Sequence, residues 1–586
     1  MLFSILTFLF GVQEGKSILP EGAASHFISG DYWNLVEMGG RLYAASGYGL
    51  AAMDTELKAV GHFPTLGYSR KVRSCDDGKL CLSDAESVAL FDASGSNLGS
   101  YEIGSEVTAL SCGQGFVAAG TESGLFAVIY LSSKNDAPAS VNLGSKVESI
   151  VFWNGYFYAA AGGSIYVITC EKAPKIIKET SLPGVKTLAA GDSRLYAGLS
   201  ESKIAVFSLK DPKEPKEESV FDAPASPVAL CFQSKKLFAA LGYQGYAVFD
   251  AKGKRLDASR GFAEGYVADI LPSKKGFYLA LRDKGIVFLE GKNFANMEIT
   301  KRLPKNAPSV HTARGGEFWA IAQGRDGAKV VKPEPEKLVV GFADPKPDNA
   351  AGVLLSGTNL YVVDPGRSLL SIFSLKEFPV TKPDFTINQA GDLSRIALSN
   401  ELILDAAGEK GLRVLWICPC GPLKEKGKLE GIKAVDVAVK DSIVYVADPD
   451  SGLWVVALRK EGETPVTLSL YPGTVSPRSL LVEQDRLYVA DSIGALAALD
   501  ISNPKEPGQL SFTMLGSRPY GLALSGSTLY LACGEKGVLK VDVSDPHSPR
   551  ILGYIDTPGK ALSVAASEAY LGVADYTSWL LLPIDK

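Results

Sequence analysis

Residues 518–559 read RPYGLALSGSTLYLACGEKGVLKVDVSDPHSPRILGYIDTPG and contain four strand-like pieces separated by turn-forming residues. The pieces are GLALS, LYLAC, VLKVDV and RILGYI, and between them stand Ser-Gly-Ser, Gly-Glu-Lys-Gly and the proline-punctuated SDPHSP. Glycine, proline, serine and aspartate favour tight turns between strands. The segment therefore predicts one antiparallel sheet of four short strands.

The second piece of this segment recurs along the whole chain. Relatives of the five-residue unit LYVAD occur fourteen times, with a mean spacing of about 41 residues. The copies begin at residues 42, 80, 116, 157, 195, 237, 277, 318, 360, 402, 444, 487, 529 and 571. A period of this length is typical of β-propeller blades. We therefore predict an all-β fold of tandem β-propellers with fourteen four-stranded blades.

The repeated unit also indicates how the blades pack. Its residues are apolar at consecutive positions, which is expected of a strand whose sheet is covered on both faces. Its fourth position is Ala, Gly or Ser in eleven of fourteen copies, and a small residue allows neighbouring sheets to approach closely. We interpret the tyrosines at its second position as packing between blades. These are Tyr43, Tyr158, Tyr196, Tyr361, Tyr445, Tyr488 and Tyr530.

Fourteen blades exceed the roughly 4 to 8 that one ring holds, so two seven-bladed rings are the most natural division. We place the first ring at residues 18–308 and the second at 309–586, separated by the proline-rich RLPKNAP at 302–308. The alternatives are rings of six and eight blades, or one open solenoid. The last repeat lacks a fourth strand, and the segment SHFISG at 25–30 is expected to supply one, to this blade or to the seventh.

Residues 1–17 suit a secretory signal peptide. LFSILTFLFGV at 2–12 is too short to span a bilayer but long enough for a leader, and Gly15 and Ser17 suit a cleavage site. No Lys or Arg precedes the run, so a packed N-terminal strand is the alternative. No other segment is long enough to span a membrane. We predict an exported protein in an extracellular, periplasmic or cell-surface location.

Composition excludes several classes of protein. The chain is 46% hydrophobic and 21% charged, which is ordinary for a globular protein and excludes a disordered or collagen-like one. Lys and Arg number 60 against 65 Asp and Glu, so the net charge of −5 gives no support for nucleic-acid binding.

Eight cysteines are too few for a disulfide scaffold. Cys75 and Cys81 flank a turn in CDDGKLC, which makes them a candidate disulfide, with two unpaired thiols as the alternative. Cys418 and Cys420 lack the second pair of ligands that a zinc site needs.

Two repeats share a short sequence motif that begins at the end of the third strand-like piece. VDVSDPHSP at 541–549 matches LDISNPKEP at 499–507, and SLKDPKEP at 208–215 is a weaker copy. Together with the LYVAD unit, this motif resembles the LVIVD repeat, a propeller-forming family found in bacterial and archaeal proteins that are often exported. The resemblance implies a propeller and a cell-envelope location. It implies no catalytic residues, since the family has no established reaction.

The fifth position of the unit is the one candidate site. It is Asp364, Asp448, Asp491 and Asp575 in the second half of the chain, but only Asp84 in the first. These residues are expected on the rim that ligands of propellers commonly use, where carboxylates would suit a hard cation such as calcium. Aspartate before a hairpin is also an ordinary turn former, because its side chain accepts nearby backbone N–H groups.

No motif in the sequence indicates catalysis: HExxH, GxSxG and CxxCH are absent. We predict a scaffold that binds a protein or glycan partner at a propeller rim and needs no cofactor, because rigid blades hold variable loops in place. The alternative is a hydrolase or lactonase-like enzyme that uses a divalent cation at a channel mouth. An enzyme would gather ionisable residues with perturbed pKa values there, whereas a binding module would show an aromatic or apolar patch on a rim.

Overall fold

The structure is a computed structural model, and the predicted leader, Cys418 and Cys420 lie outside its described residues. The described residues are 24–26, 31–75, 77–132, 137–170, 173–259, 262, 264–291, 297–303, 308–334, 337–342, 349–379, 383–387, 393, 395–399, 401–416, 424–459 and 465–584. No helix in this part of the chain is long and apolar enough to cross a membrane.

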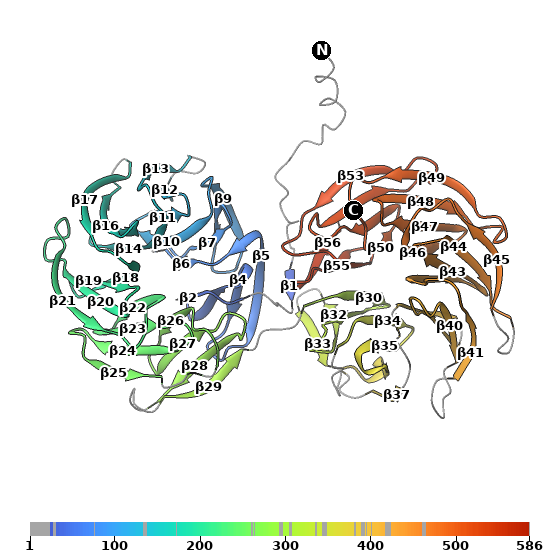
Figure 1. Cartoon of the computed structure of the whole chain (residues 1–586), viewed down its shortest axis with the longest axis horizontal. Helices are drawn as coiled ribbons and strands as arrows, with labels where there is room; N and C mark the ends of the chain where they lie inside the picture. Colours follow the sequence, from blue (N-terminus) through green and yellow to red (C-terminus); the bar gives the residue numbers. More distant parts are fainter. Residues whose placement is uncertain are drawn as a thin grey trace, which may run out of the picture. The chain divides into compact units, whose positions relative to one another are not determined.

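The described residues form strands β1 to β56 and two short 3-10 turns, η1 (Pro365–Arg367) and η2 (Leu375–Glu377). The strands make fourteen antiparallel sheets of four strands each, and thirteen of these sheets take four consecutive strands. The prediction of an all-β propeller protein with fourteen four-stranded blades is confirmed. Among the described residues, one compact unit comprises residues 24–306 and the other begins at residue 307, although strand β1 within the first range pairs with a sheet of the second unit. Figure 1 shows the sheets of each unit arranged around a centre.

Seven sheets make up the first ring. In chain order they are β2 to β5 (Asn34–Met38, Arg41–Ala45, Gly47–Met53, Ala59–Ser69); β6 to β9 (Val72–Ser74, Leu80–Asp84, Ser87–Phe91, Asn97–Glu102); β10 to β13 (Val107–Gly113, Phe116–Thr121, Leu125–Tyr130, Ala139–Asn142); β14 to β17 (Val147–Trp153, Tyr156–Ala161, Ser164–Thr169, Lys175–Ser181); β18 to β21 (Val185–Gly191, Arg194–Leu199, Lys203–Ser208, Lys216–Asp222); β22 to β25 (Ala229–Gln233, Lys236–Ala240, Tyr246–Asp250, Arg255–Ala258); and β26 to β29 (Asp269–Pro272, Gly276–Ala280, Ile286–Glu290, Glu298–Leu303).

Seven more sheets make up the second ring. They are β30 to β33 (His311–Gly315, Phe318–Ala322, Ala328–Glu334, Lys337–Phe342); β34 to β37 (Gly352–Ser356, Asn359–Asp364, Leu369–Ser374, Phe385–Ile387); β38 to β41 (Arg395–Ser399, Leu402–Ala406, Leu412–Trp416, Lys424–Leu429); β42 to β45 (Asp436–Lys440, Ile443–Asp448, Gly452–Ala457, Val466–Tyr471); β46 to β49 (Pro477–Glu483, Arg486–Asp491, Ala495–Asp500, Gly508–Met514); β50 to β53 (Gly521–Ser525, Thr528–Ala532, Val538–Asp542, Arg550–Ile555); and β54 to β56 (Ser563–Ala566, Tyr570–Ala574, Trp579–Pro583) with β1 (Ala24–His26).

Both rings are closed. The first strand of each sheet contacts the first strand of the next, and the last sheet returns to the first: β26 contacts β2, and β54 contacts β30. Backbone bridges join the same ends, because Tyr32 and Arg282 exchange N–H···O bonds of 3.1 and 3.0 Å in the first ring. Ser309 and Tyr576 do the same in the second ring. Every sheet face inside a ring is therefore covered by a neighbour.

The position of strand β1 shows which blade the segment near residues 25–30 completes. The order in the last sheet is β1-β56-β55-β54, so β1 is its outermost strand. It completes the fourteenth blade and not the seventh, which has four strands of its own. The sheet edge that β56 would otherwise expose is thereby paired.

The repeated tyrosines pack between blades as expected. Tyr43, Tyr158 and Tyr196 are buried, and each hydroxyl donates to a backbone carbonyl of the next sheet. The acceptors are Ala93 O at 2.8 Å, Pro212 O at 2.7 Å and Ala251 O at 3.1 Å, all in connections between third and fourth strands. In these three tyrosines the hydroxyl contact links neighbouring blades, whereas the buried hydroxyl of Tyr445 meets no hydrogen-bond partner among the described residues.

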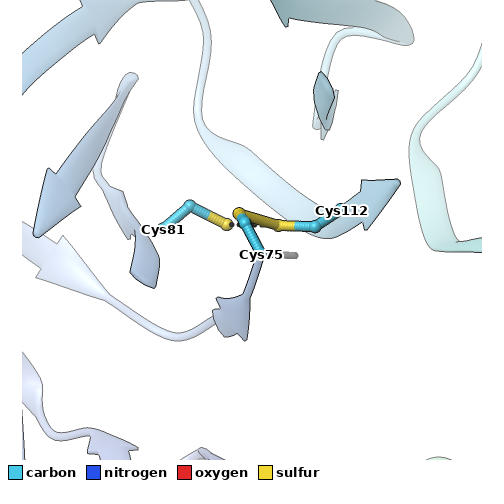
Figure 2. Close-up of side chains that lie close together, drawn as sticks. All are labelled: Cys75, Cys81 and Cys112. Carbon is cyan, nitrogen blue, oxygen red and sulfur yellow. Dashed lines mark hydrogen bonds between the residues drawn. A yellow bond between two sulfur atoms is a disulfide. The ribbon is translucent and has the colours of Figure 1, made fainter. Parts of the chain in front are cut away.

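The cysteine pairing was predicted incorrectly. Cys75 forms a disulfide with Cys112 and not with Cys81 (Figure 2). Cys75 and Cys112 belong to neighbouring sheets, and their Cα atoms are 5.3 Å apart. Stacking of the sheets, which the local turn in CDDGKLC does not reveal, brings these two residues together.

Candidate functional site

The four predicted aspartates end the second strand of their sheets, at the last residues of β35, β43 and β47 and directly after β55. All four are buried, and Asp491 and Asp575 are 0% exposed. Because neighbouring strands are antiparallel, the first strand of each sheet starts at this same end of the ring. We call this end the start rim. The aspartates therefore lie on the predicted rim, but below its surface.

Each aspartate accepts a backbone N–H from the connection that leads into its own sheet. The donors are Asn349 N to Asp364 at 3.2 Å, Lys433 N to Asp448 at 3.2 Å, Val475 N and Ser476 N to Asp491 at 2.9 Å, and Gly559 N to Asp575 at 2.7 Å. Three of them also accept an N–H from the hairpin that follows: Arg367 N, Asp450 N and Ile493 N. Each aspartate side chain thus links the buried end of a second strand to the connections of the start rim through hydrogen bonds.

The pKa values of two of the four aspartates are shifted in opposite directions. Burial would raise the pKa of Asp448, but hydrogen bonds from Ser451, Asp450 N and Lys433 N outweigh burial and hold this pKa below its usual range. Burial raises the pKa of Asp575 to about 7, and its Oδ1 meets no hydrogen-bond donor among the described residues. Repetition of one residue type therefore does not give one electrostatic environment.

These contacts are those of the turn-forming interpretation. Within the described part of the chain, none of the four aspartates belongs to a group of three or more His, Cys, Asp or Glu side chains close enough to share one ion. Calcium takes 6 to 8 oxygen ligands, and most of the carboxylate oxygens here already accept backbone N–H groups. Cation binding by the four aspartates stays a prediction.

The start rim of the first ring carries an aromatic and arginine surface, which we call the Trp33 patch. It consists of Trp33, Tyr68, Arg70, Tyr243, Tyr266 and Arg282. The Arg282 guanidinium lies over the Trp33 ring at 4.3 Å and near the Tyr266 ring at 5.2 Å. Arg70 lies 5.3 Å from the Trp33 ring and 5.1 Å from the Tyr68 ring, so both arginines contact two rings each.

Four sheets contribute connections to this patch. Trp33 precedes β2, Tyr68 and Arg70 lie where β5 leads to β6, and Tyr266 precedes β26. Tyr243 and Arg282 lie in the hairpins that follow β23 and β27. Trp33 Nε1 donates to the Tyr68 hydroxyl at 2.9 Å, while Tyr243 is 73% exposed at the far end. The patch is thus held rigid at its centre and open to solvent at its edge.

Charged and polar side chains lie at or near the starts of innermost strands next to the patch. Asp269 Oδ2 accepts Asn34 Nδ2 at 2.5 Å and Leu35 N at 2.8 Å, and Asn34 Oδ1 accepts Arg73 Nη1 at 2.5 Å. The Lys71 side chain as a whole is half-buried, and protein atoms surround its ammonium group. Burial and the like charges of Arg73 and Arg70 lower the pKa of Lys71 to about 8. An anionic group from outside would relieve this crowding of positive charge.

The second ring has a related junction between its own innermost strands. Asp436 Oδ2 accepts Leu480 N at 2.8 Å, and His311 Nδ1 accepts Val353 N at 3.3 Å. In each case the first residue of an innermost strand accepts an N–H from the innermost strand of the next sheet. Burial raises the pKa of Asp436 and lowers that of His311. These perturbed groups hold blades together.

Sequence reasoning singled out the four aspartates and missed the Trp33 patch. Its residues lie outside the repeated unit, in connections that differ from blade to blade. The available signal was the clustering of aromatic residues and arginines just before first strands, as in DYW at 31–33 and YSR at 68–70. Such a signal gains meaning only when the ring brings distant connections to one place.

Comparison with known proteins supports the repeat and the fold. The LVIVD repeat matches residues 431–457, 476–513 and 520–557, which confirms the resemblance over these ranges of the second ring. Among curated proteins, none matches the sequence significantly. A solved structure of PorZ, an essential surface component of the type-IX secretion system of Porphyromonas gingivalis, is similar over 96% of this chain and 87% of that chain, with 12% identity and a TM-score of 0.65. At this identity the likeness shows the fold alone.

Proposed function

We propose that this protein is a cell-surface β-propeller scaffold that binds a protein partner through the Trp33 patch. One observation carries the proposal: six aromatic and arginine side chains from four sheets form one continuous surface on the start rim of the first ring. Trp, Tyr and Arg are the residues that dominate the binding energy of protein interfaces. The leader-like residues 1–17 and the PorZ likeness support a surface location.

The chemistry of the patch favours a protein over a glycan. Both arginines at its centre are partly neutralised, Arg70 by Glu106 at 3.1 Å and Arg282 by Asp31 at 3.8 Å. Charged groups across an interface are arranged so that opposite potentials meet, and these two arginines therefore favour a partner that presents carboxylates. Lys71 lies near Arg73 and Arg70, so further positive charge stands beside the patch. We therefore expect a partner with an acidic surface that also presents apolar side chains to Trp33.

The enzyme alternative rests on fewer observations. It required a cation at a channel mouth, and the four aspartates that would hold it accept backbone N–H groups instead. Arg73 and Asp269 are engaged with Asn34, and although Lys71 beside them has a lowered pKa, none of the three belongs to a group among the described residues that could hold a cation. We therefore base the proposed function on the Trp33 patch and not on the four aspartates.

Site-specific photocrosslinking in cells that express the full chain tests the proposal. A photoreactive phenylalanine at Tyr243 should give a protein adduct, because this position is exposed at the edge of the patch. The same probe at Tyr570, which is exposed in the second ring, is the matched control and should give none. Trp33→Ala combined with Arg282→Ala should remove the adduct while circular dichroism stays that of the native protein.

Three results would contradict the proposal. Equal adducts from Tyr243 and Tyr570 would show nonspecific labelling. Survival of the adduct in the double variant would place the interface elsewhere. Binding to a glycan array that the double variant loses would assign the patch to a glycan partner.

A further inference from the structure

Three cysteine sulfurs meet between the second and third sheets of the first ring (Figure 2). Cys75 follows β6, Cys81 lies in β7, and Cys112 lies in β10 of the next sheet. Their sulfur atoms all lie within 4.8 Å of one another, and Cys81 Sγ is 3.4 Å from Cys112 Sγ. A disulfide between Cys75 and Cys112 needs only two of these residues. The third thiol is therefore unexplained by the cross-link.

We propose that Cys75, Cys81 and Cys112, once the Cys75–Cys112 disulfide is reduced, form a binding site for one copper(I) ion. Three sulfur ligands without nitrogen or oxygen select soft cations. Calcium and magnesium require oxygen ligands, and structural zinc takes four ligands in a tetrahedron. Among the described residues, no fourth His, Cys, Asp or Glu belongs to this group. Copper(I) accepts a trigonal set of three thiolates.

The surroundings of the sulfurs suit a soft, easily oxidised ion. Cys75 and Cys81 are buried, Cys112 is half-buried, and the apolar cluster around them includes Val107 and Leu110. Such a shell excludes water, which would otherwise compete as a ligand. The charge of Arg73, which lies opposite Cys81 in the β6–β7 pair, favours a thiolate at Cys81. Metal binding to a thiol releases its proton, so a bound cation would hold all three sulfurs as thiolates.

The three-thiol site exists only after the Cys75–Cys112 disulfide has been reduced. Reduction of the disulfide takes two electrons and two protons and yields two thiols. A dithiol supplies both and becomes a disulfide, whereas a phosphine supplies the electrons and becomes a phosphine oxide, with water supplying the protons and the oxygen. Copper(I) then displaces three protons from the three thiols, leaving a complex of net charge −2 beside the Arg73 cation. In the oxidised protein only the Cys81 thiol is available, and one thiol does not make a site. Binding therefore depends on redox state and tightens as pH rises.

Anaerobic titration of the full-length protein tests the proposal. Phosphine-reduced protein is titrated with copper(I) in competition with a chromogenic copper(I) chelator. We expect one equivalent bound, and X-ray absorption should show three sulfur neighbours. Cys81→Ser keeps the Cys75–Cys112 cross-link before reduction, so it folds as the native protein does. It should weaken binding by more than about 100-fold, the upper cost of losing an outer-shell partner.

The matched control is Cys533→Ser, which removes a buried thiol of the second ring that belongs to no such group. It should bind copper(I) as the native protein does. Equal affinity in the Cys81→Ser variant, equal binding by unreduced protein, or transfer of all the copper to the chelator would each overturn the proposal. Loss of the native circular dichroism on reduction would overturn it as well, because the three sulfurs meet only in the folded ring.

Discussion

The two rings share one blade design but fasten their start rims differently. At the fifth position of the repeated unit, the second ring has a buried aspartate in four of seven sheets. The first ring has Ser46, Asp84, Gly120, Ala161, Leu199, Leu241 and Leu281. The second ring therefore uses four carboxylates that accept backbone N–H groups, whereas in the first ring only Asp84 does so, accepting Gly67 N, and the other six positions are apolar or small. One scaffold tolerates either solution, because the sheets below the rim carry most of the buried area.

The largest difference between the rings concerns how they close. The first ring takes all its strands from one continuous stretch, while the second needs β1 from the start of the chain. Deleting residues 24–26 should therefore destabilise the second ring, on the order of 4 kcal/mol, although these residues precede the first ring in sequence. Hydrogen exchange should rise in β56 and stay unchanged in β29. Faster exchange confined to the first ring would contradict this topology.

Removing one carboxylate should affect only the second ring. In Asp491→Ala, the backbone N–H groups of Val475, Ser476 and Ile493 lose their acceptor, at a cost of about 3 kcal/mol. Calorimetry should show the second-ring transition at lower temperature and the first-ring transition unmoved. Asp491→Asn, which keeps one acceptor oxygen, should lose less. An equal loss in both variants would mean that the charge, and not the hydrogen bonds, stabilises the rim.

The corresponding test in the first ring is its cross-link. Cys112→Ser removes the disulfide to Cys75, which spans 37 residues, and should destabilise the first ring by about 2.5 kcal/mol. The second-ring transition serves as the internal control. In a reducing buffer the variant and the native protein should melt together. A difference that persists under reduction would assign the effect to packing at Cys112.

The smallest expected effect depends on pH. The folded pKa of Asp575 is raised to about 7 by burial, so between about pH 4 and 7 the unfolded chain has lost this proton while the folded chain retains it. The stability of the second ring should fall by roughly 2 kcal/mol over this range and level off above it. Asp575→Asn should lack the decline and be the more stable protein at pH 8. Parallel pH profiles for the two proteins would show that Asp575 is ionised in the fold.

The blades could be predicted from the sequence more completely than the contacts at the rims. The unit around Leu487 to Asp491 is apolar on both strand faces, so periodicity alone predicts stacked sheets, and these residues are buried as expected. The partner of Cys75 was not evident, because the local turn pointed to Cys81. The separation of 37 residues to Cys112 is close to one repeat, and this was the usable signal.

The functional surface was the least predictable part. Trp33 and Arg282 are about 250 residues apart in the sequence, and only closure of the ring brings them within 4.3 Å. Asp491 was recognised, but residue type alone does not separate a turn former from a cation ligand. Its donors Val475 and Ser476 lie in the preceding connection, and only the fold reveals them.

The strand β1 also determines the order in which the molecule becomes complete. It is among the earliest described segments to leave the ribosome, but its partner β56 is made last of all the strands. The first ring has every strand it needs long before then, while the second stays open until synthesis of the chain reaches β56. Chains that terminate early therefore carry one finished ring and one with an unpaired edge, a state that proteases and chaperones can distinguish from the complete protein.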